Sequence, residues 1–142
     1  MLSSLFFCFN FKKITIFVQK YRMNFIWVFI GGGLGSISRY GISLGTQKMY
    51  AGNLPIATFS SNILACVILG ITFYGFKDKL ESTAWISPLL ITGFCGGFST
   101  FSSWSKETVD LIQQGQWIWA VSNILISLIF GVGILLWMKM SL

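Results

Sequence analysis

Residues 93–107 read GFCGGFSTFSSWSKE and lie in an apolar stretch, where a helix crossing a bilayer would ordinarily carry leucine, isoleucine or valine. Backbone in hydrocarbon must satisfy its own polar groups. Irregular backbone rich in glycine and hydroxyls is therefore stable at membrane depth only where protein buries it or where it lines a polar cavity. Interrupted helices of this kind commonly mark ion or substrate sites. The stretch thus predicts both a broken helix and a site.

The composition of the whole chain places this stretch in a membrane protein. The 142 residues are 54% hydrophobic and 10% charged, with a mean hydropathy of +0.74, which lies outside the range of ordinary soluble domains. A spanning helix needs about 20 residues, and four apolar stretches are long enough: 25–44, 55–76, 86–105 and 117–137. We therefore expect an all-α integral membrane protein with four transmembrane helices, the third of them broken, as a multi-pass protein of the cell inner (plasma) membrane.

The residues outside these stretches argue against several other classes of protein. The polar connections at 77–84 and 106–116 are too short for a soluble catalytic domain, so we expect no enzyme. Histidine is absent, the three cysteines are widely spaced, and the four acids fall in or next to predicted loops, which argues against a metal cluster. The basic residues are scattered near helix ends and form no stripe, which argues against nucleic acid as a partner.

The first 22 residues mix phenylalanines with four basic residues and are interpreted as a basic, apolar extension. Met23 is an alternative start, and the domain proper is expected over 23–142. With both termini in the cytoplasm, the flanking cations divide seven inside (Lys12, Lys13, Lys20, Arg22, Lys77, Lys79 and Lys139) to two outside (Lys48 and Lys106). This bias predicts one firm orientation. A start at Met23 leaves three against two, weak enough for insertion in both orientations.

The first two stretches carry polar groups that need an explanation at membrane depth. The glycines within 31–35 suit a close helix interface. Arg39 lies about two-thirds of the way along its stretch, where a cation either extends to the headgroups or faces an aqueous cavity or a partner. Asn62 lies among aliphatic residues and must be hydrogen-bonded, either to another helix or as a pore-lining donor to a passing anion.

The last two stretches carry the remaining candidate groups. Glycines 96 and 97 weaken the third helix and free carbonyls that suit a hard cation such as Na⁺. Phe101 and Trp104 are three residues apart and share a helical face, which indicates either packing or positive ring edges suited to an anion. Asn123, Ser127 and Gly131 form a stripe at i, i+4 and i+8, either a helix interface or the wall of a polar track.

Three motifs in order resemble the Fluc family of fluoride ion channels, also called CrcB-type proteins: GGGLGSISRY at 31–40, PIATFSSNILACVILG at 55–70, and the stretch at 93–107. The resemblance covers residues 23–138. It implies an antiparallel, dual-topology dimer of four-helix subunits, formed with a second copy or a paired homologue in inverted orientation. It also implies two anion pathways along the subunit contact and a structural Na⁺ at the dimer centre.

The resemblance also assigns roles to individual positions. The fluoride pathway would include Asn62, Phe101, Trp104, Ser127 and Arg39, and the backbone carbonyls of Gly96 and Ser99 would hold Na⁺. Trp104 departs from the family's phenylalanine, Ser99 from its threonine, and Asn123 from its tyrosine. The implied function is passive export of cytoplasmic fluoride across the lipid bilayer, which protects against fluoride toxicity. The alternatives are a small proton-coupled exporter, which would need a carboxylate within the spans, and a non-conducting membrane scaffold.

Overall fold

The fold is described from a computed structural model that defines residues 2–50 and 55–142, with side chains from residue 23 onward. Every regular element in these ranges is a helix, in agreement with the all-α prediction. The elements in chain order are α1 (Leu2–Met49), α2 (Ile56–Gly70), η1 (Ile71–Gly75), α3 (Lys77–Ser82), η2 (Ser87–Cys95), α4 (Gly96–Phe98), α5 (Phe101–Gln113) and α6 (Trp117–Ser141). The elements η1 and η2 are π-helical, and each is continuous with a neighbouring α-helix.

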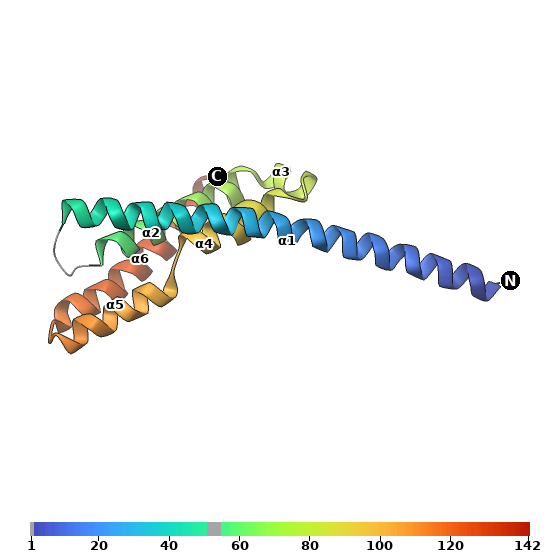
Figure 1. Ribbon diagram of the computed structural model, residues 1–142. Coiled ribbons are helices and arrows are strands. Elements are labelled where there is room, and N and C mark those ends of the chain that lie inside the picture. The colour runs from blue at the N-terminus through green and yellow to red at the C-terminus, as the bar shows by residue number, and fades with distance from the viewer. Residues whose placement is uncertain (1, 51–54) are drawn as a thin grey trace.

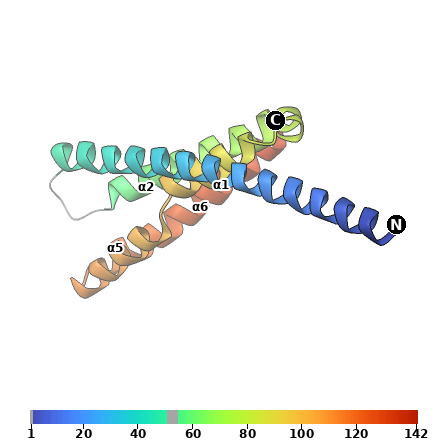
Figure 2. The same ribbon diagram turned by 45° about the vertical axis from the view of Figure 1, so that its right-hand side comes forward.

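Helix α1 is much longer than a membrane crossing requires. Its 48 residues correspond to about 72 Å at the usual rise per residue, against about 30 Å for the hydrocarbon core. Its N-terminal end extends well past the other helices (Figure 1), and the turned view agrees (Figure 2). The predicted extension over 1–22 is therefore, from Leu2 onward, backbone that continues the same helix.

Glycines allow α1 to pack closely on the third stretch. A Cβ atom on Gly31 would collide with the carbonyl oxygen of Leu89, and one on Gly35 would collide with the carbonyl oxygen of Phe94. A glycine inside a helix lowers the stability of that helix by about 1 kcal/mol relative to alanine. The close packing of the two backbones, which only glycine allows here, offsets this loss. The small-residue interface expected for 31–35 is thus present, whereas Gly33 faces open space and takes no part in it.

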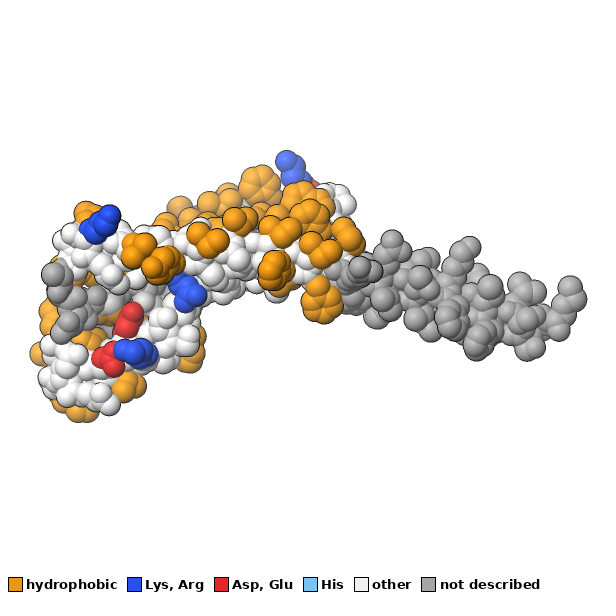
Figure 3. Space-filling model, viewed as in Figure 1, with side chains coloured by type: hydrophobic (Ala, Val, Ile, Leu, Met, Phe, Trp, Pro, Cys, Tyr) orange, Lys and Arg blue, Asp and Glu red, His pale blue; other side chains and the backbone are white. Residues whose placement is uncertain are grey.

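Two helices in the described part of the chain are long and apolar enough to cross a membrane, Ile56–Gly75 and Trp117–Ser141. Only 28% of the most apolar part of the first helix and 11% of that of the second are buried inside the chain, so neither is the covered core helix of a soluble protein. Hydrophobic side chains spread along the face that carries α1, and a group of charged side chains of both signs lies near α5 (Figure 3). These features suit a lipid environment. That four helices cross the membrane remains a prediction. The glycines and Arg39 make α1 less apolar than α6, and the third stretch is divided into shorter helices.

The third stretch changes direction at two residues. Ser99 (φ −75°, ψ 156°) and Thr100 (φ −151°, ψ 114°) are extended, and they separate α4 from α5. The Thr100 side chain caps the new helix by accepting a hydrogen bond from the Ser103 N–H at 3.2 Å. The interruption therefore coincides with the glycine and hydroxyl residues of the sequence motif.

The two polar connections differ from the loops that the sequence predicts. Residues 106–113 belong to α5, and 77–82 form α3, so both connections are largely helical. After Ser105, Thr108 and Leu111 are buried and lie three residues apart, on one face of the helix. The segment is therefore an amphipathic helix. The link to α6 is only 114–116, where Gly115 adopts φ 72°.

Candidate functional site

The side chain of Asn62 on α2 is paired with the backbone of Thr100 in the break. Its Oδ1 accepts a hydrogen bond from the Thr100 N–H at 2.7 Å, and its Nδ2 donates to the Thr100 carbonyl at 3.4 Å. The interhelical hydrogen bond considered for Asn62 is therefore present. Since a carboxamide has two N–H donors, the second is left for another acceptor.

Two N–H groups near the break donate to side chains and leave the carbonyls of Gly96 and Ser99 without their usual helical donors. In a continuous helix these oxygens would accept from the N–H groups of Thr100 and Ser103. The first N–H donates instead to Asn62 Oδ1 and the second to the Thr100 hydroxyl. Among the described residues there is no group of three or more His, Cys, Asp or Glu that could hold a metal ion. A cation here would therefore depend on backbone oxygens, and the two freed carbonyls fit a hard cation in chemical type.

Arg39 lines a hollow of about 300 Å³ between α1, α2 and α5. The other lining groups are mostly hydroxyls, among them Ser36, Thr58 and Thr100. A cation within a span is expected to face a polar cavity or a partner, and the hollow provides such a cavity. Thr100 belongs both to this hollow and to the Asn62 pair, so the break forms one wall of the hollow.

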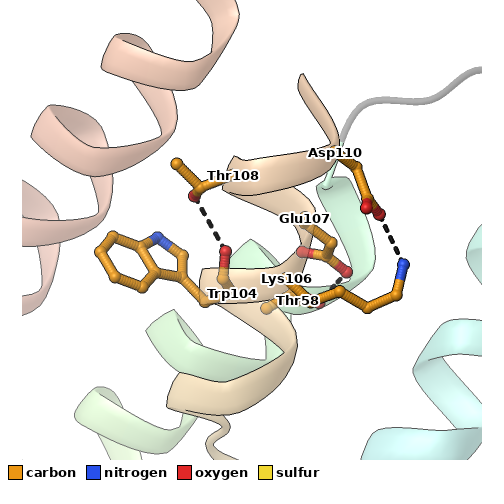
Figure 4. Close-up of polar contacts among 6 residues, drawn as sticks. All are labelled: Thr58, Trp104, Lys106, Glu107, Thr108 and Asp110. Atoms are coloured by element: carbon orange, nitrogen blue, oxygen red, sulfur yellow. Dashed lines mark hydrogen bonds and ion pairs between the residues drawn. The ribbon is translucent and has the colours of Figure 1, made fainter. Parts of the chain in front are cut away.

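Glu107 lines the same hollow from α5, although it was expected next to a loop. Its Oε1 accepts a hydrogen bond from the Thr58 hydroxyl at 2.6 Å (Figure 4), and its Oε2 is buried without a partner among the described residues. Burial raises the pKa of the Glu107 carboxyl, and the Thr58 hydrogen bond opposes this only in part. The neighbouring Lys106 instead pairs outward with Asp110 at 2.5 Å. The i, i+4 spacing of Ser103 and Glu107 was a signal that could have identified this inward face.

Phe101 and Trp104 lie together at the start of α5, with ring centroids 5.2 Å apart and an angle of 33° between the rings. Phe101 is 77% exposed on the single chain. The Trp104 indole N–H donates to the Ser127 hydroxyl oxygen at 3.2 Å and to the Asn123 carbonyl at 3.4 Å. The structure thus brings Phe101, Trp104 and Ser127 together, whereas Arg39 lines the separate hollow.

The polar stripe of α6 contacts α5 and α2. The Asn123 Nδ2 donates to the Thr108 hydroxyl at 2.8 Å, and that hydroxyl donates to the Trp104 carbonyl at 2.9 Å, a contact drawn in Figure 4. Further along α6, Gly131 faces Cys66 of α2, with 3.6 Å between the Cys66 sulfur and the position of a Cβ. Sequence reasoning did not identify Thr108, because its partner lies 15 residues away on another helix.

Comparison with known proteins adds three observations. A family model described as "CrcB-like protein, Camphor Resistance (CrcB)" matches residues 26–139. A protein of Maridesulfovibrio salexigens named fluoride-specific ion channel FluC is 38% identical over 101 residues, which cover 71% of this chain and 80% of the relative. A protein of the same name from Salmonella arizonae is 40% identical over 102 residues, which cover 72% of this chain and 80% of the relative.

Proposed function

This chain belongs to the CrcB-like protein family, and on that premise we propose that it forms a passive, fluoride-selective channel that exports cytoplasmic fluoride. Such export protects the cell against fluoride toxicity. The relatives named above are ion channels, which are not enzymes, and we propose no catalytic step. The localisation we propose is the cell inner (plasma) membrane, where the chain is a multi-pass protein.

The observation that carries the proposal is the pairing of Asn62 with Thr100, directly before the aromatic pair. Fluoride is small and strongly hydrated, so a selective path must replace its water with donors. The second Asn62 N–H, the Ser127 hydroxyl and the positive edges of Phe101 and Trp104 are donors of this kind. They belong to α2, α5 and α6. The Asn62–Thr100 hydrogen bonds join α2 to the break, and the Trp104–Ser127 hydrogen bond joins α5 to α6.

Positive potential would come from two sources. Arg39 supplies a fixed cation in the hollow that Thr100 also lines. A structural Na⁺ on the carbonyls of Gly96 and Ser99 would supply a second fixed charge. The redirected N–H groups of Thr100 and Ser103 support this site, since they leave both oxygens without their usual helical donors. Further oxygen ligands would come from the second subunit, which puts the ion at the dimer centre.

The assembly we propose is an antiparallel dimer with a second copy or a paired homologue in inverted orientation. Phe101 supports it, because a ring that is 77% exposed on one subunit can form the wall of a path only when another surface faces it. The lipid bilayer covers the remaining apolar surface. The domain that forms this assembly is 23–142.

Fluoride efflux from proteoliposomes tests the proposal against its rivals. A fluoride channel releases fluoride, retains chloride and does not respond to an imposed proton gradient. A proton-coupled exporter responds to that gradient, and Glu107, with its raised pKa, is the carboxyl to examine in that event. A scaffold passes neither anion. If the correctly assembled protein is impermeable to fluoride, the proposal is wrong.

A further inference from the structure

The indole N–H of Trp104 is shared between two acceptors on one turn of α6. It lies 3.2 Å from the Ser127 hydroxyl oxygen and 3.4 Å from the Asn123 carbonyl oxygen. Ser127 follows Asn123 by four residues, so the indole bridges the pair of groups that would otherwise bond to each other within α6. Phenylalanine at position 104 could not do this, because it has no N–H group.

Hydroxyls inside helices commonly donate to the carbonyl four residues earlier. Four of the described hydroxyls do so at 2.8 to 2.9 Å: Thr46 to Ile42, Ser61 to Ala57, Ser99 to Cys95 and Thr108 to Trp104. Ser127 does not. The Ser127 hydroxyl oxygen and the Asn123 carbonyl oxygen both accept hydrogen bonds from the Trp104 indole N–H. Ser127 donates no hydrogen bond to any described residue. The Ser127 proton is therefore available to another acceptor.

The surrounding contacts hold the indole in this position. The Asn123 side chain is buried and donates to Thr108, whose hydroxyl is bound to the Trp104 carbonyl. Phe101 packs against the indole, with 5.2 Å between the ring centroids. The Trp104 side chain is thus preorganised, which means that little free energy is needed to order it when an anion arrives.

From these contacts we propose that Trp104 is a positioning residue, which keeps the Ser127 hydroxyl away from the Asn123 carbonyl and directs its proton to the permeating anion. A hydroxyl that accepts one hydrogen bond becomes polarised and donates a second more strongly. The inference rests on the proposed function, since the anion is fluoride. It assigns Trp104 a task that a ring edge alone cannot perform.

The contact is first tested without any flux measurement. The chain has six tryptophans, and ¹⁵N labelling of the assembled protein gives indole N–H signals among which that of Trp104 is identified by its loss in Trp104→Phe. In fluoride-free buffer, Ser127→Ala should shift the Trp104 signal, and Ser122→Ala on the same helix should leave it in place. Added fluoride should shift the signal in the wild type but not in Ser127→Ala. A Trp104 signal that is indifferent to Ser127→Ala overturns the inference.

Fluoride efflux then tests the task itself. Trp104→Phe should lower the flux about fivefold, which corresponds to one hydrogen bond. The double variant with Ser127→Ala should be no worse than Ser127→Ala alone, because the Trp104 N–H acts through the Ser127 hydroxyl, which Ser127→Ala has already removed. Ser127→Thr should conduct, and the control Trp119→Phe should match wild type. Wild-type flux in Trp104→Phe, or effects that multiply in the double variant, overturns the inference alone. A wild-type assembly impermeable to fluoride overturns the proposed function with it.

Discussion

The Oδ1 atom of Asn62 lies 2.7 Å from the Thr100 nitrogen, and the Nδ2 atom of Asn62 lies 3.4 Å from the Thr100 carbonyl oxygen. One side chain of α2 thus replaces the helical hydrogen bond that the third stretch loses where it becomes extended. The same residue pair joins two candidate features, because Thr100 lines the Arg39 hollow and directly precedes Phe101. The stability of the break therefore depends on this amide, and so does the anion path that we propose.

We predict that Asn62→Ala lowers both thermal stability and fluoride flux without preventing membrane insertion. The alanine leaves the Thr100 N–H without its acceptor, which should reduce the free energy of unfolding by about 1–3 kcal/mol. Thermal unfolding in detergent and efflux from proteoliposomes measure the two effects. The matched control is Ser60→Ala on the same helix, which should behave as wild type. Unchanged flux in Asn62→Ala would remove Asn62 from the site.

Phe101→Ile should separate conduction from folding. The substitution removes the positive ring edge but keeps an apolar side chain, and Phe101 is 77% exposed on the single subunit. We expect reduced fluoride flux, normal insertion and an unchanged unfolding temperature. Phe25→Ile, at a position 73% exposed on α1, is the control that should keep its flux. Equal flux in both variants would argue that the Phe101 ring does not contact the anion.

Two alanine substitutions on α1 should have opposite effects on stability. Gly35→Ala places a Cβ against the carbonyl oxygen of Phe94, and the overpacking should cost about 1–3 kcal/mol of the free energy of unfolding. Gly33→Ala meets nothing within 4 Å and should be neutral or stabilising, because alanine favours a helix. Thermal unfolding of both variants is the measurement. Similar unfolding temperatures would contradict the close packing of α1 on η2.

The sequence was informative where the signal is local. Hydropathy alone located α6 and the continuous helix formed by α2 and η1. The glycines and hydroxyls of 93–107 indicated an irregular third stretch. It also showed that Asn62 needs a partner. It could not name Thr100, because that choice depends on how α2 packs beside a break 38 residues later in the chain.

Glu107 was misjudged for a related reason. A carboxylate after a predicted span ordinarily lies in a solvated connection, and its burial here depends on Thr58, which is 49 residues away on α2. Trp104 was recognised as a departure from the family's phenylalanine. Its two acceptors on α6 became visible only when α5 and α6 were placed side by side. Periodicity shows which residues share a face of a helix, whereas tertiary packing determines their partners on other helices.

Removal of residues 1–22 should weaken the orientation of the chain in the membrane. The truncation deletes four of the seven cations expected on the inner side and leaves the outer two, Lys48 and Lys106. Since flanking basic residues set orientation, we expect the full chain to insert one way and the chain from Met23 to insert both ways. Accessibility of a single cysteine placed at the C-terminus, measured from each side, reports this. One orientation in both proteins would contradict the prediction.

Glu107 should make stability depend on pH in a defined direction. It lies beyond the predicted span at 86–105, and burial raises the pKa of its carboxyl above the ordinary value of 4.5. The folded state therefore binds the Glu107 proton more tightly than the unfolded state does. The stabilisation from this proton is complete below pH 4.5 and is lost as the pH rises through the folded-state pKa.

Glu107→Gln removes this titration. The free energy of unfolding of wild type, relative to Glu107→Gln, should thus decrease as the pH rises from about 4.5, as measured by chemical denaturation at several pH values. Thr58→Val deletes the hydrogen bond that favours the charged carboxyl, so its decrease should continue to higher pH. Parallel pH profiles for wild type and Glu107→Gln would show that the Glu107 carboxyl is solvated in the folded protein, contrary to the buried Oε2.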